Sequence, residues 1–260
     1  MKKKLASLVS ILFLLLFLLS ATAQDKTMTW TTKSKKAKEL AQKGAEHMKN
    51  IEFPQAYEYL KQALALDPDF TVALVLMEGI TNGETKKAYA EKAIKSATNK
   101  TEGEKLFAST VAPGSTPETN RPVWAKLQKM FPNGIVIGLF YIFSLATPAE
   151  QLPVVEDYLK RFPNEPALHN LMGYLCLQEK KDTAAAKTHF EKYISLYPDG
   201  YNPYDSMGEF YFLTGDLANS EKYYNMTLDK YPFTTSAINK LKEIKTAKEK
   251  NAAKEKATTD

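Results

Sequence analysis

The chain has 260 residues, of which 44% are hydrophobic and 25% are charged. This composition is typical of a globular protein and excludes wholesale disorder, a collagen-like repeat and a polytopic membrane protein. The formal charge of +5 falls to +2 without Lys2, Lys3 and Lys4, and only Arg121 and Arg161 are arginines. We therefore expect no nucleic-acid partner, because nucleic-acid binding surfaces are strongly basic and use arginine to read phosphates and guanines.

The first 23 residues have the layout of a secretory signal peptide. The basic residues 2–4 precede an apolar stretch, Leu5 to Leu19, and the small-x-small sequence Ala21-Thr-Ala23 follows. We predict cleavage after Ala23, export to the bacterial periplasm or the cell exterior, and no stable membrane insertion after cleavage. The alternative is a retained anchor, which the short apolar stretch disfavours because a membrane span needs about 20 residues. Residues 24–33 are predicted to form a linker.

A proline recurs at intervals close to 34 residues in the rest of the chain. The gaps between Pro132, Pro163, Pro198 and Pro232 are 31, 35 and 34 residues, and Pro68 lies 64 residues before Pro132, which is two periods with one proline missing. Each proline follows an amphipathic stretch, and a proline just past a helix end stops the helix because it lacks an N–H group. The spacing therefore predicts consecutive helical hairpins.

Small residues recur in the same register as the prolines. The first unit is defined by Leu40, Gly44, Ala56, Leu60 and Ala63. The fifth unit repeats the pattern with Gly173 and Ala186 after allowance for one extra residue in its turn, and the last repeats it with Gly208 and Ser220. Small side chains at these positions let two helices approach closely.

This pattern resembles the tetratricopeptide repeat family over residues 34–233. The resemblance implies an all-α fold, a right-handed superhelical solenoid of about six helix-turn-helix hairpins. Residues 103–163 are expected to be degenerate repeats, because Asn120 and Gln151 stand where small residues are expected. Residues 234–260 are expected to form a capping helix followed by a frayed tail rich in lysine and glutamate.

Three S/T-x-x-E sequences support helix boundaries independently of the repeat. They begin at Thr101, Ser115 and Thr147 and predict helix starts near residues 102, 116 and 148. The apolar run from Ile135 to Ala146 is predicted to be a helix buried on nearly all sides. The alternative is an exposed patch for a partner.

Reactive and metal-binding residues are scarce. Cys176 is the single cysteine, so no intramolecular disulfide can form, and His47, His169 and His189 lack the spacing of a zinc site. We predict no metal, no other cofactor and no catalytic residue. Cys176 with His169 or His189 is the only pairing of a thiol with an imidazole, and inert packing of Cys176 is favoured, with His189 facing solvent.

The resemblance also implies a function, namely a non-catalytic scaffold that binds a protein or peptide in a groove lined by the first helix of each hairpin. The predicted partner-binding residues share that face: Asn170, Tyr174, Gln178, Asp205, Glu209 and Phe212. Acidic and amide groups beside aromatic rings suggest a basic or polar segment as the partner. The simpler interpretation of Asp205 and Glu209 is a like-charged pair on a solvated face. The alternative function is an envelope enzyme, or a subunit of one, with a polar site joining residues 103–163 to His169 or Cys176.

Overall fold

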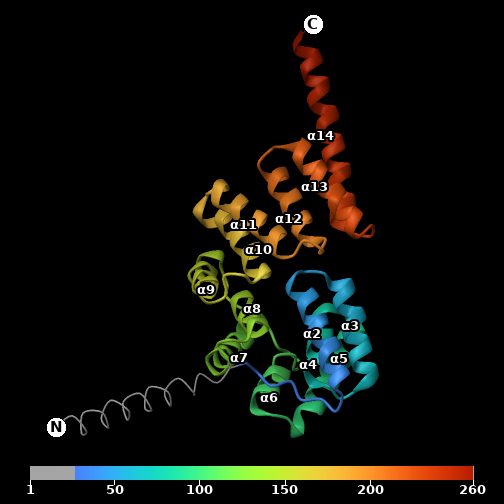
Figure 1. Ribbon diagram of the computed structural model, residues 1–260, viewed down its shortest axis with the longest axis vertical. Helices are drawn as coiled ribbons and strands as arrows, with labels where there is room; N and C mark the ends of the chain where they lie inside the picture. The colour runs from blue at the N-terminus through green and yellow to red at the C-terminus, as the bar shows by residue number, and fades with distance from the viewer. Residues whose placement is uncertain (1–26, 260) are drawn as a thin grey trace, which may run out of the picture.

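The computed structural model describes residues 27–259, so the predicted signal peptide and its cleavage site lie outside the described residues. Within that range the chain forms thirteen α-helices arranged as six hairpins and a final helix (Figure 1). The hairpins are α2 (Lys35–Lys49) with α3 (Phe53–Leu66), α4 (Thr71–Ile80) with α5 (Gly83–Ser96), α6 (Glu102–Ser109) with α7 (Pro117–Met130), α8 (Ile135–Phe143) with α9 (Pro148–Arg161), α10 (Pro166–Leu175) with α11 (Thr183–Leu196), and α12 (Asn202–Leu213) with α13 (Leu217–Lys230). The predicted all-α fold of about six hairpins with a capping helix, here α14 (Thr235–Thr259), is confirmed.

Glycines on the first helix of a hairpin make the close approach to the second helix possible. A Cβ atom at Gly44 would lie 2.7 Å from Cγ of Leu60, and one at Gly173 would lie 2.6 Å from Cε1 of Phe190. Such distances are well inside van der Waals contact, so a larger residue would overpack the hairpin. Gly138 belongs to the same series, 35 residues before Gly173, and the sequence pattern above does not include it.

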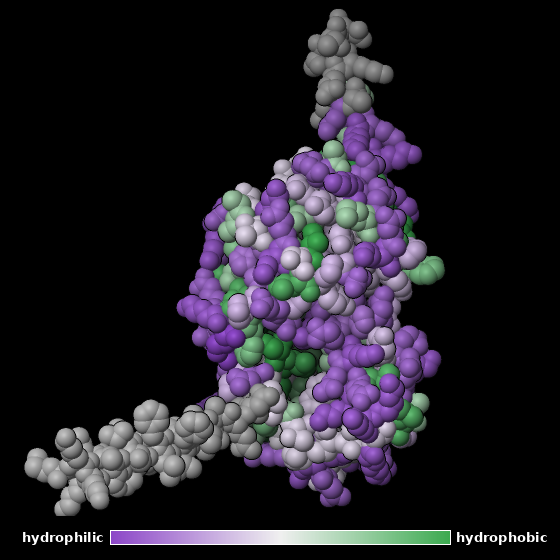
Figure 2. All heavy atoms as spheres, viewed as in Figure 1, coloured by the Kyte–Doolittle hydropathy of each residue, from purple (hydrophilic) through white to green (hydrophobic). Residues whose placement is uncertain are grey.

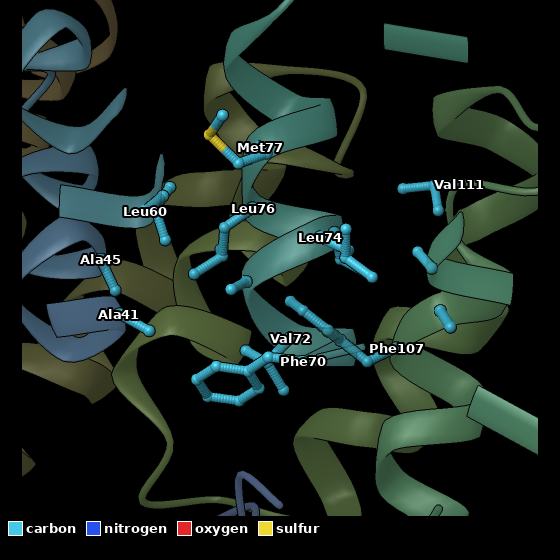
Figure 3. Packing of buried hydrophobic residues seen from close by; sticks show 14 of the residues in the cluster. Ala41, Ala45, Leu60, Phe70, Val72, Leu74, Leu76, Met77, Phe107 and Val111 are labelled. Carbon is cyan, nitrogen blue, oxygen red and sulfur yellow. The ribbon is translucent and has the colours of Figure 1, made fainter. Parts of the chain in front are cut away.

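The N-terminal half is built around α4, which is buried along most of its length. Polar residues dominate the outer surface (Figure 2), and the apolar side chains of α4 point to both sides of the helix (Figure 3). Leu76 is directed toward Leu60 on α3, and Leu74 toward Phe107 and Val111 in the region of α6. A short helix that is apolar all round is therefore stable here because both neighbouring hairpins cover it.

The predicted helix starts agree with the structure to within one residue. Thr101 and Glu104 form the expected reciprocal capping box at the start of α6. At α7, however, the cap is Thr116 rather than Ser115, and its partner is Thr119. Thr147 caps α9 by accepting a hydrogen bond from the backbone N–H of Glu150.

The extra residue of the fifth unit is absorbed by a π-helical turn, η2 (Cys176–Lys180), that follows α10. Lys181 then adopts a left-handed conformation with φ of 52°. The backbone N–H of Asp182 donates to the carbonyl of Cys176 at 3.0 Å, which closes the turn before α11 begins. The insertion thus leaves the packing of α10 on α11 in register with the other hairpins.

Both ends of the described chain differ in detail from the prediction. Residues 27–33, predicted as part of a linker, are packed along the first hairpins, where Thr31 donates from its N–H and its hydroxyl to buried Glu104 at 2.8 Å. Helix α14 continues to Thr259 through the segment predicted to fray, which is rich in the strong helix formers alanine, lysine and glutamate. Near its start α14 covers Tyr224 with Ala237 and Ile244, as expected for a cap.

Candidate functional site

The first hairpin returns to the last two, so the array of hairpins closes on itself (Figure 1). The contact centres on Glu52, which lies in the turn between α2 and α3 and is only 2% exposed. Its Oε2 accepts a hydrogen bond from the Tyr197 hydroxyl at 2.8 Å, and its Oε1 accepts from the N–H groups of Tyr201 at 2.7 Å and Asn202 at 3.4 Å. Nδ1 of His47 lies 2.7 Å from Oε2. One buried carboxylate therefore joins residues that are about 145 to 150 positions apart.

Further polar contacts extend this closure. The Asn202 side-chain amide donates to the Tyr193 hydroxyl at 3.1 Å, and that hydroxyl donates to the carbonyl of Asn50 at 3.4 Å. On the other side of the contact, Nζ of Lys49 lies 2.9 Å from Oε1 of Glu165. Repeat arrays ordinarily form contacts only between neighbouring units. These contacts hold the first hairpin at a fixed separation from the fifth and sixth hairpins. The local repeat pattern does not predict them.

An apolar cleft lies inside the closed array, between α2, α4 and α8. Figure 2 shows hydrophobic atoms in a hollow at this place. The cavity has a volume of about 250 Å³, and its lining is almost entirely apolar: Ala45, Met48, Lys49, Ile51, Phe53, Leu76, Gly79, Val136, Leu139, Phe140 and Phe143. Three of these side chains are large and hydrophobic yet exposed, since Ile51 is 42%, Phe53 45% and Phe143 57% exposed.

Helix α8 forms most of the apolar run from Ile135 to Ala146. The prediction that this run is buried on nearly all sides is correct for only part of the helix. Ile137, Leu139 and Ile142 are buried, whereas Phe143 at its end points to solvent beside the cleft. The difference arises because α2 and α4 stand across the cleft from α8 instead of packing fully onto it. The exposed-patch alternative describes this end of the helix better.

The six predicted partner-binding residues lie on α10, η2 and α12, and four of them form specific contacts. The Tyr174 hydroxyl donates to Oε2 of Glu209 at 2.7 Å, which links two neighbouring hairpins. Oδ1 of Asp205 accepts from the Ser236 hydroxyl at 2.8 Å. Phe212 has Nζ of Lys240 4.4 Å from its ring centroid. The remaining two are placed differently, with Asn170 buried and Gln178 exposed in η2.

Burial makes the electrostatics of this face unusual. It raises the pKa of Asp205 to about 6, and the nearby charge of Glu209 adds to the effect. The pKa of Tyr174 is raised well above its ordinary value, mainly by burial and then by the charge of Glu209. Asp205 is therefore a carboxyl group whose ionised form is poorly solvated near neutral pH.

The thiol and imidazole groups do not form a reactive pair. Cys176 is 1% exposed, and burial raises the pKa of its thiol, which disfavours the reactive thiolate. His169 bonds to the carbonyl of Pro163 through Nε2 and to His189 through Nδ1, each at 3.0 Å. His189 is thus half-buried against His169, and the expectation that it faces solvent is wrong. Neither His169 nor Cys176 lines the apolar cleft.

Metal-binding clusters and membrane-spanning helices are both absent from residues 27–259. No group of three or more His, Cys, Asp or Glu side chains in this range is arranged to hold a metal ion. None of the helices there combines the length and apolar character needed to cross a bilayer.

The tetratricopeptide repeat family matches residues 172–200, which run from the end of α10 to the turn before α12. The resemblance is confirmed for this repeat. No curated protein sequence matches the chain.

Several solved structures resemble the chain at low identity. PilW, a widely conserved type IV pilus biogenesis factor, is 14% identical, with 80% of this chain and 99% of PilW covered and a TM-score of 0.47. PilF of Pseudomonas aeruginosa is 15% identical, with 80% and 98% covered and a TM-score of 0.43. A thermophilic tetratricopeptide repeat protein of Thermus thermophilus is 15% identical, with 80% and 98% covered and a TM-score of 0.38.

Proposed function

We propose that this tetratricopeptide repeat protein is a non-catalytic scaffold that holds a segment of another protein inside its closed array of hairpins. The observation that carries the proposal is the apolar cleft with Ile51, Phe53 and Phe143 exposed at its edge. Large hydrophobic side chains gathered at one concave place are a feature of protein interaction sites. A partner that buries them gains hydrophobic free energy of about 25 cal/mol for each Å² removed from water.

Closure of the array prepares the cleft for binding. The walls of the cleft belong to hairpins that are far apart in the sequence, and the Glu52 contact together with the Lys49–Glu165 ion pair fixes the first hairpin against the fifth and sixth. A site held in its bound geometry binds more tightly, because less conformational entropy is lost on association.

The polar face on α10, η2 and α12 is proposed as a second contact region for the same partner. It consists of the predicted residues Asn170, Tyr174, Gln178, Asp205, Glu209 and Phe212. Tyr174, Asp205 and Glu209 are half-buried and keep part of their surface open to solvent. Their chemistry favours a basic or polar part of the bound segment, whereas the cleft favours an apolar part.

Site-specific photo-crosslinking tests the cleft. With p-benzoylphenylalanine in place of Phe143, cells that produce the protein are expected to yield one discrete adduct, and mass spectrometry should locate the attachment within an apolar segment of the partner. Adding Phe53→Asp places a charge in the cleft and should reduce the adduct by about tenfold or more.

The matched control is Leu213→Asp, since Leu213 is also exposed but does not line the cleft. This variant should leave the adduct unchanged. Phe233 is exposed outside the cleft, and p-benzoylphenylalanine in its place should give different adducts or no adduct. Identical adducts from positions 143 and 233 would show that the cleft is not the binding site.

We also propose that the protein is exported, to the periplasm or the cell exterior, on the basis of the leader in residues 1–23. The intact mass of the protein recovered from the producing bacterium is expected to equal that of a chain beginning at Gln24. Recovery of a chain that still carries Met1 would rule out cleavage after Ala23.

A further inference from the structure

We propose that His169 and His189 form an acid-sensitive latch in the fifth hairpin, which opens when the pair takes up a second proton and thereby loosens the closure of the array. His169 lies on α10 and His189 on α11, so the latch joins the two helices of this hairpin. The inference deepens the proposed function and rests on it, because closure prepares the cleft for binding. An open latch releases the bound segment in acid.

The hydrogen bonds of the pair fix which nitrogen of each ring carries a hydrogen. Nε2 of His169 lies 3.0 Å from the carbonyl oxygen of Pro163, and because a carbonyl only accepts, this nitrogen is the donor. In the neutral ring the other nitrogen, Nδ1, is then an acceptor. It lies 3.0 Å from Nδ1 of His189, which therefore donates to it. A single hydrogen thus joins the two rings.

The pair accommodates one added proton but not two. The first proton binds Nε2 of His189, the ring nitrogen without a hydrogen, and it leaves the bond between the two Nδ1 atoms in place. The second proton can bind only Nδ1 of His169. It would set two N–H groups and two positive rings against each other at a separation of 3.0 Å. The doubly protonated pair is therefore incompatible with the folded hairpin.

The surroundings of the rings also oppose a second positive charge. Within residues 27–259, the side chains outside the pair whose charges act on it are Lys192 on α11 and Lys180 in η2, and both are positive. Glu156 on α9 pairs with Lys180 at 2.7 Å instead of compensating the rings. Burial is the main cause that lowers the pKa of both rings, and for His189 the charge of His169 comes next.

The latch is connected to the closing contact through the turn between α9 and α10. Pro163, whose carbonyl accepts from His169, lies two residues before Glu165 in this turn. Glu165 accepts from Nζ of Lys49 through both of its carboxylate oxygens, at 2.9 and 3.0 Å, and Lys49 lines the apolar cleft. His169 is only 9% exposed, so a charged ring there has to move toward water and gives up its bond to Pro163. The turn then no longer holds Glu165 against the first hairpin.

The balance between the closed and the open latch depends on pH. The open form binds one proton more than the closed form, so the ratio of open to closed rises by up to about tenfold for each unit by which the pH falls. The lowered pKa values give the same sign for stability. Below the ordinary histidine pKa of 6.5 the folded hairpin binds fewer protons than the unfolded chain, so its stability is present above pH 6.5 and declines as the pH falls.

A distance measurement between the first hairpin and the turn before α10 tests the latch. Glu39→Cys on α2 and Asn164→Cys in the turn are exposed sites for nitroxide labels, and Cys176 is buried and is not labelled. Double electron–electron resonance should give a narrow distribution of distances at pH 7.5. At pH 4 the distribution should broaden and shift to longer distances, while circular dichroism shows that the helices are retained.

His189→Gln is the variant that isolates the latch. Its amide can donate to Nδ1 of His169 at neutral pH and, after rotation, can accept from the same nitrogen when that is protonated. The labelled variant should therefore keep the narrow distribution at both pH values. The matched control is Thr188→Gln, an exposed position beside His189, which should respond to acid as the parent chain does. An unchanged distribution in the parent chain at pH 4, or an equal acid response in His189→Gln, would overturn the inference.

The cross-link from position 143, formed in an extract of the producing cells, separates the latch from the proposed function. Its yield should fall by about tenfold or more between pH 7.5 and pH 4, and this fall should be absent from His189→Gln. If the yield falls equally in both chains, the scaffold function stands and release through the latch is wrong. If no cross-link forms at any pH, the proposed function fails, and the distance measurement still decides whether the latch exists.

Discussion

Replacing Glu52 with alanine is expected to lower the free energy of unfolding by about 3 to 5 kcal/mol. The substitution removes the acceptor shared by the Tyr197 hydroxyl and by the N–H groups of Tyr201 and Asn202. The N–H groups of Tyr201 and Asn202 then stay buried without this acceptor, and each such loss is costly. The Tyr197 hydroxyl loses its shorter hydrogen bond and keeps the contact with Nδ1 of His47 at 3.2 Å. Urea denaturation followed by circular dichroism measures the change.

Two control variants make this result specific. Glu58→Ala removes an exposed carboxylate from α3 and should change stability by less than about 0.5 kcal/mol. Glu52→Gln keeps an oxygen that can accept from the backbone of Tyr201, so its cost should be clearly smaller than that of alanine. If Glu52→Ala is as mild as Glu58→Ala, the closing contact contributes little to the fold.

Replacing Asp205 with asparagine is expected to stabilise the protein at pH 7.5, by about 1 to 3 kcal/mol. The pKa of Asp205 is raised from 3.8 to about 6 in the folded protein. A raised carboxyl pKa favours the protonated form on folding, so this contribution to stability is present below pH 3.8 and is lost as the pH rises through about 6. Asparagine resembles the protonated form at every pH, and its side-chain oxygen can still accept from Ser236.

Thermal unfolding of wild type and Asp205→Asn at pH 7.5 and at pH 4 tests whether the substitution raises or lowers the free energy of unfolding. The gain should be largest at pH 7.5 and should nearly disappear at pH 4, where wild-type Asp205 is protonated in the folded state. A loss of stability at pH 7.5, or an equal change at both values, is incompatible with a desolvated Asp205 carboxylate.

The hairpins could be predicted from sequence because the pattern that makes them is local. A glycine such as Gly44 and its partner Leu60 lie 16 residues apart, within one hairpin, and prolines mark the hairpin ends. The predicted start of α7 is one residue early because Ser115 and Thr116 both carry a capping hydroxyl. Sequence spacing cannot show which of two adjacent hydroxyl groups caps the helix.

The closure and the cleft could not be predicted in this way. Glu52 bonds to residues about 145 to 150 positions away, and no repeat pattern specifies contacts at that separation. The apolar character of α8 was evident, but whether Phe143 would be covered depends on the curvature of the whole array. The family pattern placed Tyr174 and Glu209 on the first helices of neighbouring hairpins, and the structure brings these two side chains into contact at 2.7 Å. The partner of this face remains a proposal.

The measurement that tests closure most directly is a double-mutant cycle between Glu52 and Tyr197. Unfolding free energies of wild type, Glu52→Ala, Tyr197→Phe and the double variant give the coupling between the first and fifth hairpins. We predict a coupling of about 1 to 3 kcal/mol, because the two side chains share a hydrogen bond of 2.8 Å whose acceptor, Glu52, is buried. Additive effects, with no coupling, would contradict an array that closes through Glu52.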